Sequence, residues 1–184
     1  MRKIISLLLA LVMVLGLFAA CGNTAEPTVP ATEEPTEAPT EAAVPASDIA
    51  ILSTNDVHTY IDNPLSYDVI AAVKAELQKE YDYVLLVDAG DAIQGTAYGS
   101  MDKGETIIKL MNAAGYDLAT LGNHEFDYGM EGTMNVIEWA ELPYTSCNFY
   151  HEKDGVVGET VLDAYKVFNT ESGLKVAFVG LTTP

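Results

Sequence analysis

Short apolar runs alternate with amphipathic stretches from about residue 48 to the end of the chain. The apolar runs predict strands near residues 49–52, 84–87, 118–121 and 144–149. Between them, apolar residues recur every three or four positions, and this spacing predicts helices over residues 68–79, 105–114 and 130–142. Gly115 and Pro143 stand where the second and third helical stretches would end.

The order of these elements predicts an α/β fold in which helices cover both faces of a sheet. Residues 166–168 and 175–179, joined through Glu171-Ser172-Gly173, predict a closing β-hairpin. A hairpin added to parallel strands would make the sheet mixed. The chain ends just beyond the hairpin, where an active-site loop would begin. We therefore expect residues 48–184 to be the first part of a longer domain.

The N-terminal residues carry a different pattern. Two basic residues precede a nearly uninterrupted apolar run over residues 4–20, which predicts an export signal peptide over residues 1–20. A membrane-spanning helix is the alternative, but the run is at the short edge of the roughly 20 residues that cross a bilayer. The stretch Leu17–Gly22 is similar to a bacterial lipobox, in which cleavage before Cys21 leaves that residue free for acylation. We therefore expect an exported protein, anchored by lipid to the outer face of the bacterial cell membrane.

Composition limits the partners of the protein. Residues 21–47 are mainly Pro, Thr, Ala and Glu, and such a segment buries too little to fold, so it is predicted to be a spacer. The net charge of −18 argues against binding of a nucleic acid polymer, which relies on basic patches. A small phosphate ester is still compatible, because exposed charges are screened beyond about 8 Å. Bound divalent cations would also dominate the local field.

Polar clusters follow three of the predicted strands. They are Asn55-Asp56-Val57-His58, Gly90-Asp91 and residues 122–127. Ligands collect at the carboxyl ends of strands in open α/β sheets, so these clusters predict one metal site built from separate loops. Taken singly, each cluster is more simply explained as a solvated turn. Their joint occurrence after successive strands is what favours the metal site.

The residue types fit metal-assisted hydrolysis of a phosphate ester. Two divalent cations about 3.5–4 Å apart can lower the pKa of bound water to about 7 and hold the attacking and leaving oxygens. Such a pair needs a bridging carboxylate together with terminal oxygen and nitrogen ligands. Asp91 follows Gly90, which permits a sharp turn because it lacks a Cβ atom. Ligands of nitrogen and oxygen without sulfur favour Mn, Zn, Fe or Co over Mg.

The stretches 54–58, 87–96 and 121–127 resemble those of the calcineurin-like metallophosphoesterases, specifically their 5′-nucleotidase branch. Gly180-Leu181-Thr182-Thr183 resembles the strand end that follows in that branch. The resemblance spans residues 48–184, and it implies an α/β sandwich of the metallophosphoesterase type. It also implies hydrolysis of a nucleotide to a nucleoside and phosphate.

The resemblance implies a role for several residues. Asp56 and His58 would hold the first metal, Asp91 would bridge both metals, and Asn123 would hold the second. His124 would lie beside the phosphoryl group without binding metal, to stabilise developing charge or protonate the leaving alkoxide. Asp127 would orient and charge that imidazole. Asp88 and Glu125 match motif positions too, and we interpret them as supporting or solvated carboxylates.

The chain also departs from the family pattern. The family supplies three further metal-binding histidines downstream, whereas this chain has only His58, His124 and His151, the last in a polar loop. We therefore expect weak metal binding and little turnover from this chain alone. Activity as a 2′,3′-cyclic-nucleotide phosphodiesterase or as a nucleotide-sugar or dinucleotide pyrophosphatase shares the same metal core and stays open. The alternative of another class is a non-catalytic solute-binding or adhesive lipoprotein.

Overall fold

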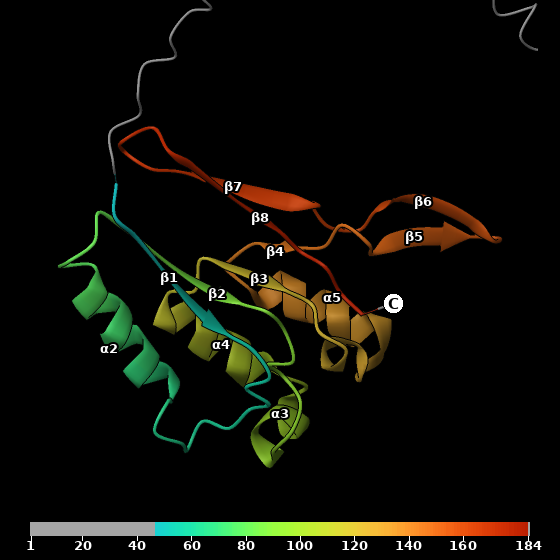
Figure 1. Ribbon diagram of the computed structural model, residues 1–184. Helices are drawn as coiled ribbons and strands as arrows, with labels where there is room; N and C mark the ends of the chain where they lie inside the picture. The colour runs from blue at the N-terminus through green and yellow to red at the C-terminus, as the bar shows by residue number, and fades with distance from the viewer. Residues whose placement is uncertain (1–46, 184) are drawn as a thin grey trace, which may run out of the picture. The chain divides into compact units, whose positions relative to one another are not determined.

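The computed structural model describes residues 47–183. Its central element is a four-stranded sheet in which the strands lie in sequence order and neighbouring strands are parallel. The strands are β1 (Ile49–Thr54), β2 (Tyr83–Asp88), β3 (Leu118–Thr120) and β4 (Tyr144–Thr145) (Figure 1). Because all four run the same way, their carboxyl ends lie along one edge of the sheet.

Helices connect these strands. They are α2 (Tyr67–Leu77), α3 (Ala97–Asp102), α4 (Glu105–Ala114), the 3-10 turn η1 (His124–Phe126) and α5 (Gly129–Trp139). Helix α4 shows why the sequence folds in this way. Ile107, Ile108 and Met111 share one face of α4 and are fully buried, and Gly115 ends the helix in a left-handed conformation with φ of 76°.

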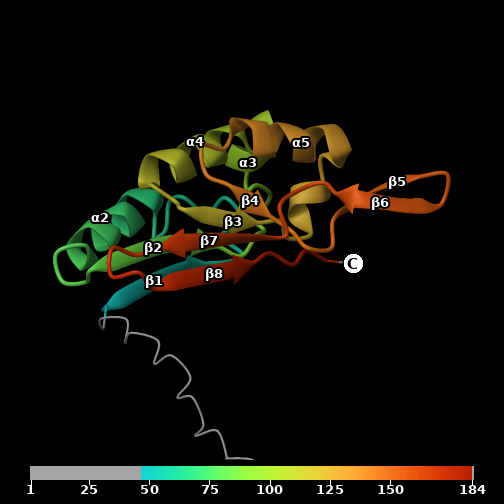
Figure 2. The ribbon, with the colours of Figure 1, turned by 90° about the horizontal axis from the view of Figure 1, so that it is seen from above.

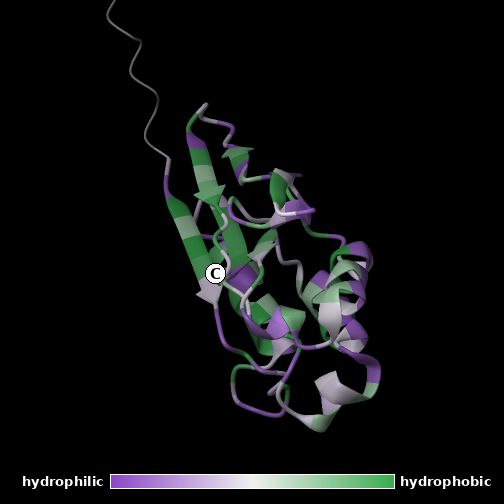
Figure 3. Cartoon of the chain, turned by 90° about the vertical axis from the view of Figure 1, so that its right-hand side faces the viewer, coloured by the Kyte–Doolittle hydropathy of each residue, from purple (hydrophilic) through white to green (hydrophobic). Residues whose placement is uncertain are grey.

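The helices gather on one side of the sheet. Figures 1 and 2 both place α2, α4 and α5 on the same face. The apolar sides of α4 and α5 pack with Leu86 and Leu121 of the strand region to form the core. The strands are mostly hydrophobic, and hydrophilic residues are frequent on the helices (Figure 3). The core therefore lies between one sheet face and the helices.

Two antiparallel hairpins complete the described residues. The first pairs β5 (Tyr150–Lys153) with β6 (Val156–Thr160), and the second pairs β7 (Tyr165–Asn169) with β8 (Lys175–Val179). The second hairpin lies on the face of the sheet away from the helices (Figures 1 and 2). The α/β class is thus confirmed, with the face opposite the helices partly covered by strands.

Two details of the predicted sheet are wrong. The β7–β8 hairpin forms a sheet of its own, so the four-stranded sheet is parallel and not mixed. Helices also do not cover both faces among residues 47–183, because the hairpin occupies the second face. After Thr145 the backbone N–H groups of Ser146 and Cys147 donate to the carbonyl oxygens of Asp163 and Gly180, so the hairpin is held beside β4 by bonds at its ends and not by a continuous ladder. These bonds end β4 after two residues, well before the predicted end at residue 149.

The structure leaves the N-terminal predictions untested. The signal peptide over residues 1–20, the lipidation site Cys21 and all but the last residue of the spacer lie outside the described residues. Within residues 47–183, no helix combines the length and the hydrophobicity that crossing a membrane requires.

Candidate metal centre

The loops that follow β1, β2 and β3 meet at the carboxyl edge of the sheet. His58, Asp91 and His124 each offer one ligand atom, and these atoms all lie within 4.8 Å of one another. Each residue comes from a different loop. The structure therefore brings three residues of the predicted polar clusters into one group that could hold a metal ion.

Backbone hydrogen bonds join the first two loops. The N–H groups of Asp56 and His58 donate to the carbonyl oxygens of Gly90 and Asp91 at 3.0 and 2.9 Å. The residues Asp56, His58 and Asp91 all have positive φ, at 51°, 48° and 60°. Non-glycine residues rarely adopt this conformation, and it concentrates at functional sites where the surrounding structure holds it.

A hydrogen bond fixes the orientation of the His58 ring. Its Nδ1 lies 2.9 Å from the carbonyl oxygen of Gln94, which can only accept, so Nδ1 carries the proton and donates. Nε2 is then unprotonated in the neutral ring and available to a metal. This nitrogen lies 3.7 Å from Oδ1 of Asp56. The role of Gln94 could not be read from the sequence, because only its backbone takes part.

Asp56 and Asn123 lie in the same loops as the clustered residues. The Asp56 side chain is 60% exposed, and its Oδ2 accepts a hydrogen bond of 2.6 Å from Nδ2 of Asn55. Asn123 precedes η1 and lines a hollow of about 500 Å³ together with Phe126 and Phe149. Asp56 is not part of the cluster within 4.8 Å, although it lies in the first of the loops that form it, and Asn123 directly precedes His124 in the third loop.

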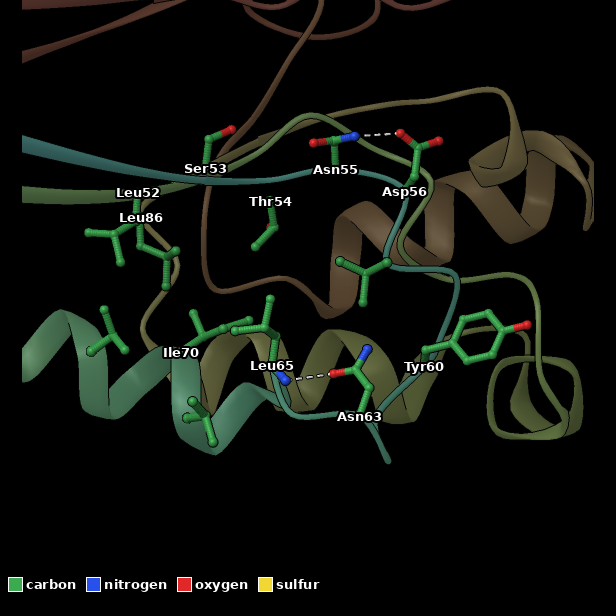
Figure 4. Close-up of a pocket in the computed structure, with 13 residues that line it drawn as sticks. Leu52, Ser53, Thr54, Asn55, Asp56, Tyr60, Asn63, Leu65, Ile70 and Leu86 are labelled. Atoms are coloured by element: carbon green, nitrogen blue, oxygen red, sulfur yellow. Dashed lines mark hydrogen bonds between the residues drawn. The ribbon is translucent and has the colours of Figure 1, made fainter.

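A second cavity adjoins the site at Asp56. It has a volume of about 470 Å³ and lies between β1 and α2 (Figure 4). Leu52, Leu65 and Ile70 line it, whereas Asn55 and Asp56 lie at its polar edge (Figure 4). Its largely apolar wall offers few groups that could bind a phosphate.

Asp91 lies at the centre of the cluster and is only 9% exposed. Its Oδ1 accepts a hydrogen bond of 2.7 Å from the backbone N–H of His124. Gly122 packs against the same carboxylate so closely that a Cβ atom there would lie 2.3 Å from Oδ1. The glycine is therefore needed for the second and third loops to approach each other.

His124 forms a pair with Asp127. Its Nδ1 lies 2.7 Å from Oδ2 of Asp127, and this hydrogen bond raises the pKa of His124 above its ordinary value. The carboxylate thus keeps Nδ1 protonated and leaves Nε2 for another partner. The rings of His124 and His58 meet edge to face with centroids 4.9 Å apart. The free nitrogen of His124 could bind a metal or carry the proton of a general acid.

Asp88 and Glu125 are both buried, so the solvated alternative for them is wrong. Asp88 accepts hydrogen bonds from the Gly90 N–H at 2.8 Å and from the Thr54 hydroxyl at 2.5 Å. Burial raises the pKa of Asp88 to about 7. The Tyr116 hydroxyl lies 2.9 Å from that of Thr54 and extends this buried network. Sequence reasoning gave no role to Thr54, although it begins the stretch 54–58, and missed Tyr116, because a hydroxyl that contacts a buried carboxylate is not a ligand-type side chain.

A parallel α/β sheet with histidine and carboxylate side chains gathered at its carboxyl edge fits the class of metallophosphoesterase-like proteins. Residues 49–175 match the family profile described as calcineurin-like phosphoesterase, and the chain belongs to this family. It is 36% identical over 143 residues to the 5′-nucleotidase of Vibrio vulnificus (strain CMCP6), a match that covers 73% of this chain and 25% of the relative.

Two further proteins show the same partial match. The snake venom 5′-nucleotidase of Gloydius brevicauda is 36% identical over 153 residues, covering 74% of this chain and 26% of its own. The solved structure of the Haemophilus influenzae NAD nucleotidase matches with a TM-score of 0.64 and 31% identity, covering 74% of this chain and 26% of that one. The chain thus spans about a quarter of the length of these relatives.

Proposed function

We propose that this chain contributes part of the active site of a metal-dependent phosphohydrolase that converts nucleotides to nucleosides and phosphate. The observation that carries this proposal is the group of His58, Asp91 and His124 at the ends of three loops. The relatives named as 5′-nucleotidases support a nucleotide substrate.

The donor groups fit divalent metals. The hydrogen bond from His58 to Gln94 uses Nδ1, so Nε2 is left for a metal. The bond from the His124 N–H uses Oδ1 of Asp91 and does not involve Oδ2. We propose that Asp56 and His58 hold one ion, that Asp91 bridges, and that Asn123 holds a second ion. Mn, Zn, Fe or Co suits these nitrogen and oxygen ligands. Such ions, when bound, supply an activated water and stabilise charge on the phosphoryl oxygens.

We propose that His124 acts on the leaving group. Asp127 holds Nδ1–H, so a proton on Nε2 can pass to the departing alkoxide oxygen. The raised pKa of His124 keeps a larger fraction of the imidazole protonated near neutral pH than an isolated imidazole would have. The same charge would stabilise the phosphoryl oxygens.

Identification of the products decides between this proposal and its alternatives: a nucleoside and phosphate from AMP, two mononucleotides from NAD, or a nucleoside monophosphate from a 2′,3′-cyclic nucleotide. The complete product of the gene is assayed with Mn²⁺ or Zn²⁺ on AMP, NAD and a 2′,3′-cyclic nucleotide, which separates nucleotidase, pyrophosphatase and cyclic phosphodiesterase activity. We expect Asp91→Asn to lose both metal and activity, and His124→Ala to lose phosphate release while keeping metal. Undiminished hydrolysis of AMP by Asp91→Asn would refute the proposal. A product without activity on any phosphate ester would favour the non-catalytic lipoprotein.

We also propose that the protein is exported and lipid-anchored through Cys21. The support is the apolar run over residues 4–20 and the lipobox-like sequence before Cys21. Labelling of bacterial cells with a radioactive fatty acid is expected to label the protein and not its Cys21→Ser variant. Equal labelling of both would rule out this anchor.

A further inference from the structure

We propose that Glu125 is a positioning residue, which locks the loop that carries Asp91 to the loop that carries Asn123 and His124. This inference rests on the proposed function, because it concerns the geometry of the same candidate metal centre. Glu125 itself is not proposed as a metal ligand, since its two oxygens are directed at backbone N–H groups.

The Glu125 carboxylate joins two loops that are distant in sequence. Its Oε2 accepts hydrogen bonds from the N–H groups of Asp91 at 2.8 Å and Gly122 at 2.6 Å. Its Oε1 accepts one from the N–H of Ala92 at 2.9 Å. The side chain is 1% exposed, so water does not compete for these bonds. Three backbone donors on two loops therefore share a single acceptor group.

Burial of this carboxylate is costly without a specific partner. Burial raises the pKa of Glu125, and its hydrogen bonds with Asp91, Ala92 and Gly122 oppose that rise. No lysine or arginine forms an ion pair with it within residues 47–183. The N–H groups thus supply all of the compensation that the structure shows. A buried acceptor tied only to backbone fixes the path of that backbone.

The backbone that Glu125 holds is strained. Gly90 and Asp91 have φ of 100° and 60°, and the N–H groups of Asp91 and of the next residue, Ala92, donate to the carboxylate. A second bond runs in the opposite direction, from the His124 N–H to Oδ1 of Asp91. The two loops are therefore tied twice, once through Glu125 and once through Asp91. Loss of the first tie leaves the Asp91 turn free to relax.

Glu125 is also hydrogen-bonded to helix α5. The Thr133 hydroxyl is fully buried and donates to the carbonyl oxygen of Glu125 at 2.8 Å. This bond ties Glu125 to a packed helix, and Glu125 in turn holds the N–H of Asp91. Supporting residues of this kind typically change metal affinity by about 10–100-fold when they are replaced.

Metal affinity and amide exchange test this role in the purified protein. The Glu125→Gln variant keeps the shape but exchanges one acceptor oxygen for a donor, and Glu125→Asp keeps the charge but is one methylene too short. We expect both to bind Mn²⁺ about 10–100-fold more weakly in calorimetric titration. We also expect faster hydrogen exchange at the amides of Asp91, Ala92 and Gly122. The control Ile108→Val alters the buried face of α4 and should keep both readouts near the wild-type values.

The outcomes separate this inference from the proposed function. Unchanged Mn²⁺ affinity and unchanged exchange in Glu125→Gln would overturn the inference, as would a loss no larger than that of Ile108→Val. If Glu125→Asp kept full affinity, negative charge alone would suffice and the positioning role would be wrong. If the wild-type protein bound no metal, the proposed function would fail, and the exchange rates would still decide whether Glu125 holds the two loops.

Discussion

Replacing Gly122 with alanine would press a methyl group against the Asp91 carboxylate. The new Cβ atom would lie 2.3 Å from Oδ1 and 2.6 Å from Cγ of Asp91. Optimal non-bonded separations are about 3.5 Å, so the carboxylate and the loop must separate by roughly 1 Å. Asp91 cannot simply turn away, because its Oδ1 also holds the N–H of His124.

The expected magnitude follows from these contacts. Overpacking of a closely fitted site costs about 1–3 kcal/mol, and a weakened hydrogen bond to the charged carboxylate adds to the same loss. A displacement of about 1 Å in a ligand also disturbs metal geometry, so we expect Mn²⁺ affinity to fall at least about 10-fold. Gly122→Ala should therefore be affected in both stability and binding.

Urea unfolding and calorimetric titration with Mn²⁺ measure the two effects separately. Gly158→Ala is the matched control, because its Cβ atom would lie no closer than 3.3 Å to its nearest neighbour, the carbonyl oxygen of His151, in an exposed hairpin. It should leave Mn²⁺ affinity unchanged and cost little stability. If Gly122→Ala unfolded at the wild-type urea concentration and bound Mn²⁺ within two-fold of the wild type, the packing argument would be refuted.

Three further predictions concern the buried network, the histidine pair and the core. Burial raises the pKa of Asp88 from 3.8 to about 7, so the folded state retains a proton that the unfolded state loses. Stability should therefore fall by up to roughly 4 kcal/mol as pH rises from about 4 to 7, and Asp88→Asn should flatten this dependence in urea titrations at several pH values. An unaltered pH profile in that variant would exclude Asp88 as its source. Asp127→Asn should lower the pKa of His124 towards its ordinary value in an NMR titration of the metal-free protein, and an unchanged pKa would show that the hydrogen bond is not its cause. Ile107→Ala should cost about 2–5 kcal/mol in urea unfolding, because the side chain is fully buried under the sheet; a cost below 1 kcal/mol would contradict this packing.

Elements with a strong one-sided pattern could be predicted from sequence. The bounds of α4 agree with the prediction because buried residues share one face and Gly115 ends the helix. The β5–β6 hairpin was missed, since most of its side chains are exposed and no alternation marks it. Asp154 and Gly155 did signal its turn, where both have positive φ. Helix α3 was missed because it has only six residues, although Thr96 caps it by accepting from Tyr98 N–H.

In the candidate site, the side chains could be predicted from sequence and the backbone contacts that hold them could not. Asp56, His58, Asp91 and His124 are predicted as site residues because ligand-type side chains follow apolar strands, and the structure brings the last three together. The contacts that hold them could not be predicted, since these run through backbone groups that every sequence possesses. Glu125 looked like one more carboxylate beside a motif, and only the folded chain shows that it binds three N–H groups.

The left-handed backbone at Asp56, His58 and Asp91 limits how this centre can be altered by mutation. A β-branched replacement would meet a steric penalty before any change in ligand chemistry was felt, whereas asparagine tolerates the same conformation. Alanine substitution at these positions would therefore combine two effects, a change in backbone strain and the loss of the polar side chain. A redesign that seeks a different metal preference can therefore use few residue types at these three positions. A library restricted to Asp, Asn, His and Gly would sample most of what the backbone accepts.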